Sequence, residues 1–499
     1  MSEYLHGVYG DSQANGNRVS EESESAIVCI GTAPVQTVAG GAKYVNKPVL
    51  VRNISEAKRF FGYSDDWASY TLCEAMHHFF ETKGIGPLVI INVLDPAVHK
   101  AQTATTKSLT PNNGRITVTN AESAILDSVE VKTQDETPQT KELGTDYTIA
   151  YNSAKKTIVI TGISGRLGTD ALTVTYNTVT PSAVTADTVI GASDGLGTNT
   201  GVFAVKNVYQ LTGVIPAYMI APGFSSMPSV HAAMYQNSQK VNGHWDLWMF
   251  VDMPILDGST PITMDSAVTW KNANGYNHEN ETVYFPMIAG LDGKKYHLSV
   301  IAAANFLELL SENEGIPYHS ASNTDAPITE KLWLGEGSED KLFDDEIINE
   351  KLNKNGIASA AFVGGRWAVW GAHAADYSQD NADYVNVAET NRMMLYYVSN
   401  DFQARRPRDV DQPMTANDIA SIVAEEQNRL DGLKAMGALI FGEAALDADS
   451  LENSDVYSGD FVFEFRVTTT PLAKSLKAIV TWVDDGFSTY FATGESDVA

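Results

Sequence analysis

Strand-like apolar runs alternate with helical segments along most of this 499-residue chain, and that alternation restricts the fold to the α/β classes. Residues 26–34 (AIVCIGTAP) and 87–95 (PLVIINVLD) are almost continuously apolar, which is typical of strands buried on both faces. Residues 65–84 have the apolar stripe of a helix, with Asp66 as its expected cap and Gly84 as its end. We therefore expect βαβ units that build a mixed or parallel sheet.

A change in composition divides this pattern into two parts. Residues 101–200 are rich in Thr, Ser, Asn and Gly, and their short alternating segments are separated by turn residues. Strands at this spacing predict a small β-sandwich. Because α/β patterning lies on both sides, we expect an inserted domain, with the α/β core divided between residues 26–100 and 201–375.

The composition argues against several classes of function. A formal net charge of −28 disfavours an exposed nucleic-acid surface, which needs clustered Lys and Arg. No run of about 18 apolar residues is present, and the first residues lack the pattern of a signal peptide, so we expect synthesis and folding in the cytosol. Cys29 and Cys73 lie in apolar contexts and are expected to be free thiols. A chain this acidic repels its own copies, so any assembly requires strong local contacts.

The last part of the chain poses a pairing problem. Phe461, Phe463, Phe465 and Val467 alternate with polar residues, as in a half-buried strand. After Pro471, residues 478–483 have the composition of a second strand, which we expect to extend as far as Tyr490. A terminus is usually disordered unless something holds it, so these strands require a partner in this chain or in another one.

No local motif indicates catalysis. His77 and His78 are adjacent on a predicted helix and point about 100° apart, so they do not chelate one ion together. The glycine-rich residues 162–168 lack the helix of a phosphate-binding loop. Nothing in the sequence places Asp252, His297 and Ser322 together as a triad. We therefore assign no catalytic, cofactor-binding or metal-ligating residue and expect no cofactor and no enzymatic activity.

Several motifs, taken in their order along the chain, resemble those of contractile phage tail sheath proteins. They are residues 26–34 with 46–62, the Ala-Pro-Gly turn after residues 217–220, residues 315–328, residues 353–377 with their Trp-Gly end, and residues 431–442. Ala321 stands where the family usually has proline, and Ala372–Ala374 replace its usual Asn-Arg-Thr. The resemblance covers residues 27–95 and 200–490.

The resemblance implies a six-part organisation. The two core segments and the insert are joined by an N-terminal arm (1–25), a C-terminal helical and strand domain (376–470) and a C-terminal arm (471–499). The arms would add strands to a small sheet in neighbouring subunits, through Tyr4, Leu5 and Val8 at one end and Ile479, Val480, Trp482 and Val483 at the other. The host strand would carry Phe461, Phe463, Phe465 and Val467.

The resemblance also implies partners and a place of action. A sheath subunit polymerises with itself as stacked hexameric rings around a tail tube and meets tail tube, baseplate and terminator proteins. It contracts to drive the tube through a bacterial envelope. It assembles in the host bacterial cytoplasm and ends in a phage tail, or in a headless particle such as an R-type bacteriocin, after lysis. It binds no nucleic acid directly and inserts into no membrane.

One predicted helix is the candidate contact with the tube. Residues 416–441 form a single helix in this prediction, and in the family a helix of this region lies near the tube. Arg429 and Lys434 are its basic residues, and five positions separate them by roughly 140° around the axis. Only one of them needs to face the tube.

Two other classes of function remain open from the sequence. One is an α/β enzyme of the hydrolase type with a β-sandwich insertion, which would need a pocket with convergent titratable groups. The other is a surface binding protein that uses the sandwich.

Overall fold

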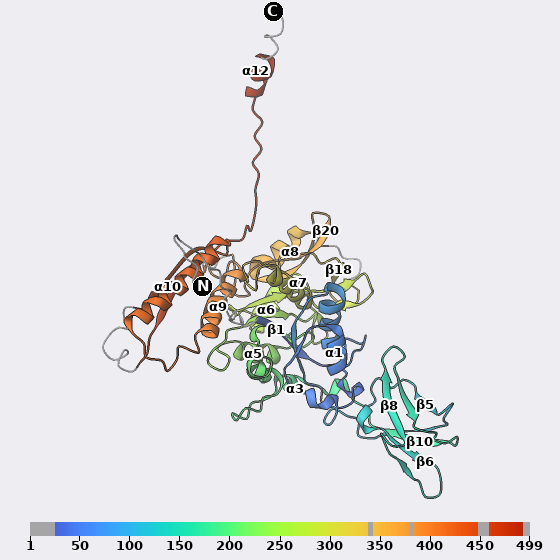
Figure 1. Ribbon diagram of the computed structural model, residues 1–499. Helices are drawn as coiled ribbons and strands as arrows, with labels where there is room; N and C mark the ends of the chain where they lie inside the picture. The colour runs from blue at the N-terminus through green and yellow to red at the C-terminus, as the bar shows by residue number, and fades with distance from the viewer. Residues whose placement is uncertain (1–24, 338–342, 380–382, 448–458, 493–499) are drawn as a thin grey trace, which may run out of the picture.

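The computed structural model describes residues 25–337, 343–379, 383–447 and 459–492. Tyr4, Leu5 and Val8 of the predicted N-terminal arm lie outside the described residues. The predicted mixed α/β fold with an all-β insert is confirmed. A central α/β body carries the insert at one end and a helix–strand module at the other (Figure 1).

The body is built on an eight-stranded sheet in the order β2-β3-β1-β11-β12-β15-β19-β20. The pairs between β3 and β19 are all parallel, whereas the edge strands β2 and β20 run antiparallel to their neighbours. Every residue of β3, β11, β12 and β15 is buried, which explains the nearly continuous apolar sequence of the first three. The strands are β1 (Ser25–Gly31), β2 (Val49–Val51), β3 (Leu88–Asn92), β11 (Ile215–Ile220), β12 (Trp248–Asp252), β15 (Glu281–Tyr284), β19 (Ile357–Val363) and β20 (Arg366–Trp370).

Helices cover this sheet and complete one large core. The most buried of them, α7 (Leu298–Glu312), packs on β11, β12 and β15, and α5 (Pro228–Gln236) packs on β12. Around them lie α1 (Ile54–Phe61), α3 (Ala186–Ile190), α4 (Val208–Thr212), α6 (Ala267–Ala273) and α8 (Asp345–Lys351). Small sheets β13–β14 (Leu256–Asp257, Thr260–Pro261) and β17-β16-β18 (Lys295–Tyr296, Met287–Gly290, Thr329–Trp333) lie at the periphery.

The helix predicted over residues 65–84 is shorter and less regular than expected. It begins only at α2 (Leu72–Met76) and continues as a π-helical segment, His77–Lys83. Asp66 does not cap it, because its carboxylate accepts a hydrogen bond from Ser69 N in the preceding turn. Gly84 does end it, with the positive φ of 68° that favours glycine.

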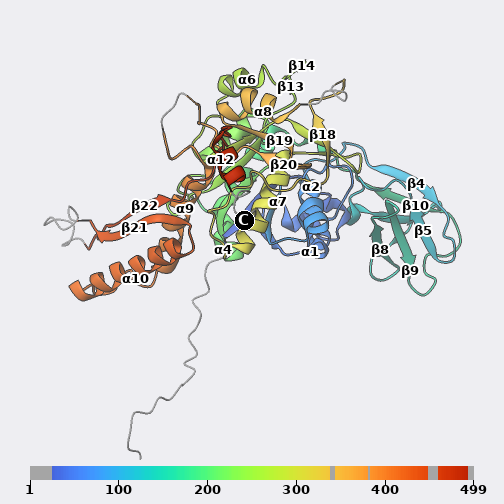
Figure 2. The same cartoon turned by 90° about the horizontal axis from the view of Figure 1, so that it is seen from above.

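The insert is a β-sandwich with its own core. One sheet has the order β4-β10-β6-β7 and the other β5-β9-β8 (Figure 2). Apolar residues of both sheets form one buried cluster. The strands are β4 (Thr105–Leu109), β5 (Arg115–Val118), β6 (Glu130–Thr133), β7 (Thr140–Lys141), β8 (Tyr147–Asn152), β9 (Thr157–Gly162) and β10 (Leu172–Tyr176). The outgoing and returning chains meet where Ala101 N donates to Thr178 O at 2.8 Å. Val179 and Val189 already belong to the core of the body, so the chain re-enters it well before residue 200.

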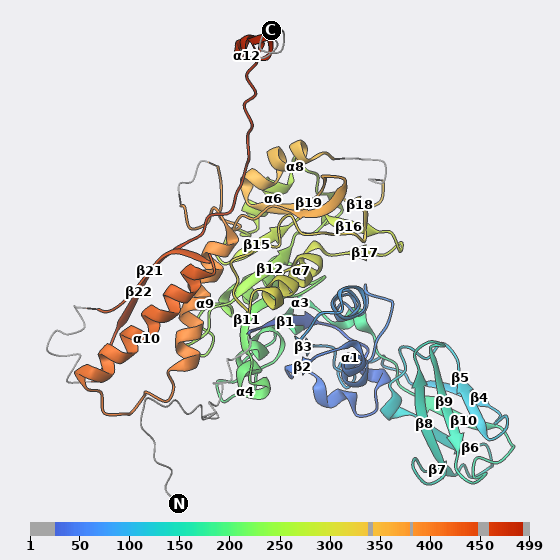
Figure 3. The ribbon, with the colours of Figure 1, turned by 45° about the horizontal axis from the view of Figure 1, so that its top comes forward.

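The C-terminal module projects from the body on the side opposite the sandwich (Figure 3). It contains α9 (Glu389–Arg405), α10 (Ala416–Ala435), β21 (Leu439–Leu446) and β22 (Phe463–Thr469). Its small core joins both helices to the strand pair. The predicted helix 416–441 was too long, because Gly437 takes a φ of 85° and residues 439–441 belong to β21. Among the described residues, no helix is both long and apolar enough to cross a bilayer.

The closeness of Ala101 and Thr178 makes the insert removable. Replacing residues 102–177 with a short Gly-Ser linker should leave a folded chain, because the main core loses none of its strands. Circular dichroism should show one cooperative melt within a few degrees of the intact chain. The excised segment, expressed alone, should fold on its own core. An aggregated remainder would show that the insert completes the fold of the body.

Candidate functional site: the strand pair and the C-terminal segment

The two-stranded sheet β21–β22 packs on the small apolar core of the C-terminal module. The two strands pair antiparallel, and β22 alternates between half-buried and exposed side chains. Phe465 and Val467 pack into the module's core, while Phe463 and Phe465 meet Phe402 of α9 with ring centroids 5.8 and 5.2 Å apart. The structure thus places the proposed host residues on one inward face. Phe461 precedes the strand and is also half-buried.

Both strands leave an edge without a neighbouring strand in the described part of the chain. Gln427 of α10 covers part of the β21 edge, since its side chain accepts a hydrogen bond from Ala444 N at 2.9 Å and donates one to Gly442 O at 3.1 Å. Beside it, the side chains of Ile440 and Phe441 are 61% and 44% exposed. An incompletely paired edge with exposed apolar side chains is a template for strand addition.

Ion pairs join the end of α9 to the middle of α10. Glu426 is buried and accepts paired hydrogen bonds from Arg405 at 2.8 and 2.6 Å, and Arg406 approaches the same carboxylate at 2.5 Å. Burial alone would raise the pKa of Glu426, but the two guanidinium groups outweigh burial and lower the pKa. Sequence reasoning missed this group, whose only local signal was the adjacent pair Arg405 and Arg406.

The two basic residues of α10 have different surroundings. Arg429 faces α9, where its guanidinium contacts the Asp401 carboxylate at 2.5 Å and donates to the Tyr397 hydroxyl at 3.1 Å. Lys434 is exposed near the end of the helix and pairs only with Asp431, one turn away, at 3.1 Å. Arg429 therefore belongs to the interior of the module, whereas the side chain of Lys434 lies on its surface.

The segment after β22 leaves the body of the molecule. Residues 470–484 contain no helix or strand, and Figures 1 and 3 show the chain before α12 extended away from the rest of the molecule. The apolar side chains of this segment are largely exposed: Leu476 92%, Ile479 82%, Val480 92%, Trp482 77% and Val483 60%. Contiguous apolar exposure of this kind marks an interaction site.

The extended segment is held only at its root. Residues 472–475 line a groove of the body, and Lys474 Nζ donates to the Tyr377 hydroxyl at 2.8 Å and lies 5.2 Å from the centre of that ring. The predicted hinge after Pro471 is therefore partly anchored. Departure from the body follows Ser475.

The predicted strand 478–490 needs a correction. Its second half is helical, because α12 spans Asp485–Ala492 and Trp482 lies against Phe487 with ring centroids 6.2 Å apart. Its first half pairs with no strand among the described residues. Asp485 in the first turn favours the helix by interaction with its dipole, a signal that the apolar composition of Phe487 and Tyr490 obscured.

The residues weighed for catalysis are not gathered into a site. Asp252 accepts hydrogen bonds from the backbone and hydroxyl of Ser299, whereas His297 pairs with Glu74 at 2.7 Å. Ser322 accepts a hydrogen bond from Gly371 N elsewhere on the body. His77 forms an ion pair with Glu81, and burial lowers the pKa of His78 to about 3.

The overall fold of the chain is similar to that of sheath proteins of known structure. The chain resembles the sheath of the PVC extracellular contractile injection system in its contracted state, with a TM-score of 0.52, 10% identity, and coverage of 97% of this chain and 99% of that one. The contracted helical sheath of the anti-feeding prophage gives a TM-score of 0.52 at 12% identity, covering 97% and 100%. A sheath tail protein of Desulfitobacterium hafniense gives 0.51 at 11%, covering 93% and 100%.

Similarity in sequence points the same way. A tail sheath protein of Burkholderia phage BcepMu is 32% identical over 229 residues, which is 46% of this chain and 45% of that protein. The matched region thus spans less than half the length of this curated relative. No protein-family model matches the chain. The resemblance to tail sheath proteins predicted from the sequence motifs is confirmed by these matches.

Because Arg429 and Lys434 have different surroundings, replacing each with alanine should have different effects on stability. Arg429→Ala removes one of the two cations beside Asp401, which should destabilise the module by about 1–3 kcal/mol. Lys434→Ala should change stability by less than about 0.5 kcal/mol. Hydrogen exchange of the α9 and α10 amides reports opening of the module separately from the body. Equal exchange in both variants would contradict the assignment of Arg429 to the interior.

Proposed function

We propose that this chain is a sheath subunit that polymerises as stacked rings around a tail tube and contracts to drive the tube through a bacterial envelope. One observation carries the proposal. A single chain holds both a two-stranded sheet with open edges and an extended apolar segment that its own body leaves uncovered. The fold similarity to contracted sheaths supports it.

The two features fit each other as donor and acceptor. Residues 476–483 would span roughly 26 Å as a strand, at about 3.3 Å per residue, which matches the length of the seven-residue β22. Addition to an open edge would supply main-chain hydrogen bonds for affinity, while the side chains of Ile479, Val480, Trp482 and Val483 would set the register. A neighbouring copy would receive the segment, and residues 1–24, with Tyr4, Leu5 and Val8, would supply the second added strand.

Strand addition accounts for a lattice that moves without coming apart. Each body is rigid because its main sheet and helices share one core. The link to the neighbour passes through residues 470–484. These residues form no helix or strand, so the link could bend without breaking regular structure. Rings could therefore rotate, widen and shorten while every donated strand stays paired. The energy for contraction would come from interfaces formed in the contracted state, with no cofactor or nucleotide.

The remaining partners follow from the same role. The subunit would contact its own copies, a tail tube protein, and baseplate and terminator proteins. It would assemble in the cytoplasm of a host bacterium and act in a phage tail or a headless contractile particle after lysis. The sandwich lies at the end of the body opposite the C-terminal module, so it would face outward if that module lies near the tube.

Ending the chain at Ser475 tests donation directly. The shortened chain keeps β22 and the Lys474 anchor, so its melting temperature should equal that of the intact chain. Each subunit would lose several strand hydrogen bonds worth about 1 kcal/mol net apiece, together with the buried face of Trp482. Negative-stain microscopy should show tubes from the intact chain and none from the shortened one.

A second, shorter truncation serves as the control: it tests whether loss of the apolar segment, and not merely a shorter chain, prevents assembly. Removing only residues 493–499 takes away the end of the chain but leaves the whole apolar segment, so tubes should form. Tubes from the chain that ends at Ser475 would contradict strand donation. A melting temperature lowered by that truncation would show that the segment folds back on its own subunit.

Charge reversal tests the contact with the tube. Lys434→Glu should weaken the extended sheath around its tube and leave contracted sheath intact, because only the extended state would bring α10 against the tube. Lys155→Glu makes the same charge change on the exposed surface of the sandwich and should leave both states unaffected. Microscopy of particles assembled with the tube protein would count the two states. Unchanged extended tails in Lys434→Glu particles would place the contact elsewhere.

A further inference from the structure

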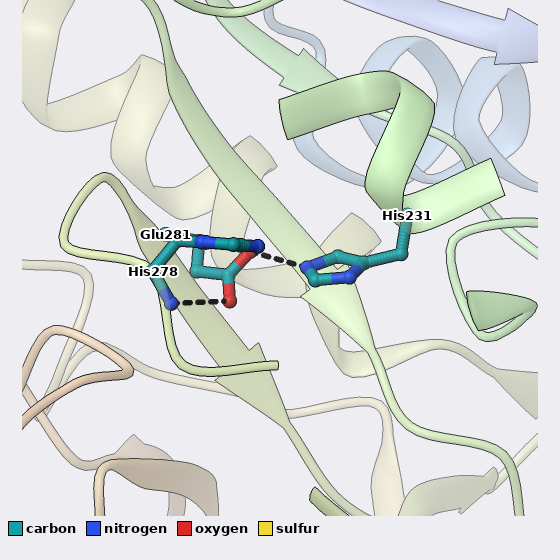
Figure 4. Close-up of side chains that lie close together, drawn as sticks. All are labelled: His231, His278 and Glu281. Carbon is teal, nitrogen blue, oxygen red and sulfur yellow. Dashed lines mark hydrogen bonds and ion pairs between the residues drawn. The ribbon is translucent and has the colours of Figure 1, made fainter. Parts of the chain in front are cut away.

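Two histidines and a glutamate from separate parts of the sequence meet inside the body. His231 lies on α5, His278 precedes β15, and Glu281 is the first residue of β15. One ligand atom from each lies within 4.8 Å of the other two. Figure 4 shows the His231 imidazole and the Glu281 carboxylate pointing toward each other, with His278 on the carboxylate side. His231 is 47 positions from His278, so the sequence offers no local signal of the group.

Two of the three side chains in this group are fully buried, unlike those of a surface ion pair. His231 is 1% exposed and Glu281 0%, and His231 Nε2 lies 2.5 Å from Glu281 Oε2. The second carboxylate oxygen accepts a hydrogen bond from the backbone N–H of His278 at 3.1 Å. The side chain of His278 is only half-buried, which leaves a route from solvent to the group.

Aromatic rings hold both imidazoles in place. Tyr276 stacks on His231 with ring centroids 3.8 Å apart and planes inclined by 6°, and Tyr235 stacks on His278 at 3.4 Å and 7°. The Tyr276 hydroxyl is itself fixed by a hydrogen bond to Ser225 O at 2.8 Å. These contacts limit the rotation of both imidazoles.

Lys271 is the nearby cation, and its ammonium does not neutralise the Glu281 carboxylate by direct contact. Lys271 is buried close to Glu281, but its ammonium donates to Asn277 Oδ1 at 2.8 Å and to the backbone oxygens of Asn355 and Ala375. No ion pair between Lys271 and Glu281 is present, although both residues are described. The Glu281 carboxylate instead contacts the His231 imidazole and the backbone N–H of His278.

We propose that His231, His278 and Glu281 bind a divalent transition-metal ion of the Zn²⁺ type. Two imidazoles and one carboxylate are an established ligand set for this class, with water in the fourth position. Ligands about 2.0–2.2 Å from the ion lie about 3.3 Å apart in a tetrahedron. The 2.5 Å separation of Nε2 and Oε2 would therefore open by less than about 1 Å.

The ion would brace the body next to the root of the C-terminal module. Glu281 O also accepts a hydrogen bond from Ala375 N at 2.9 Å, on the segment that leads toward α9. A metal on Glu281 would thus link α5, β15 and that segment. The proposal concerns stability and does not depend on the chain being a sheath subunit.

The test uses the full-length chain without a histidine tag, treated with chelator and then titrated with Co²⁺ or Zn²⁺. We expect one Co²⁺ per chain, visible absorption typical of tetrahedral coordination, and a melting temperature raised by several degrees. His278→Ala removes the half-buried ligand and should weaken Co²⁺ binding about tenfold or more. Its metal-free melting temperature should stay close to that of the intact chain.

His244→Ala is the matched control, because His244 is exposed and lies away from the group. It should bind Co²⁺ as the intact chain does. Absence of the Co²⁺ spectrum in the intact chain, or an equal response in His278→Ala, would overturn the proposal and leave His231 and Glu281 as a buried hydrogen-bonded pair. If His278→Ala fails to fold, His278→Asn serves the same purpose with a ligand of much lower affinity.

Discussion

A strand edge inside this molecule must be paired or covered, and that requirement organises the structure. Backbone N–H and C=O groups that are buried without partners cost about as much as a lost hydrogen bond each. The main sheet meets the requirement within the chain, since its parallel centre is buried and its two edges end in short antiparallel strands, β2 and β20. The strand pair β21–β22 does not meet it within the described residues. Under the proposed function, a neighbouring subunit would complete this strand pair.

Charge sets the conditions under which a partner can be accepted. A chain with a net charge of −28 repels its copies at long range, although salt screens this repulsion beyond about 10 Å. The attraction that overcomes it must therefore be short-ranged, as main-chain hydrogen bonds and apolar burial are. Inside the C-terminal module, by contrast, Arg405, Arg406 and Arg429 are all engaged by Glu426 and Asp401. These three cations hold the two helices of the module together and are not available to attract other acidic surfaces.

Separate cores allow the parts of the chain to carry different tasks. The body, the sandwich and the C-terminal module each have their own apolar cluster. The module is tied to the body by buried hydrogen bonds such as Asn400 Nδ2 to Asp246 O at 2.9 Å, which fix the angle at which α9 leaves. In the proposed function, the firmly attached strand pair would accept a strand and the extended C-terminal segment would donate one, so that subunits could change position while staying linked.

The sequence by itself determined the elements whose signal is local. Continuous apolar runs identified β1 and β3, alternation identified the sandwich strands and β22, and the ordered motifs identified the sheath resemblance. Local signals failed where a single residue changed the outcome: Gly437 ended α10 before residue 441, and Asp485 began a helix where a strand was expected. The tertiary structure alone decided which charges are buried, because Arg429 and Lys434 look alike in sequence and only packing turns Arg429 toward Asp401. It alone brought His231 to His278 and Glu281, since chain folding, and no sequence period, sets the distance between α5 and β15.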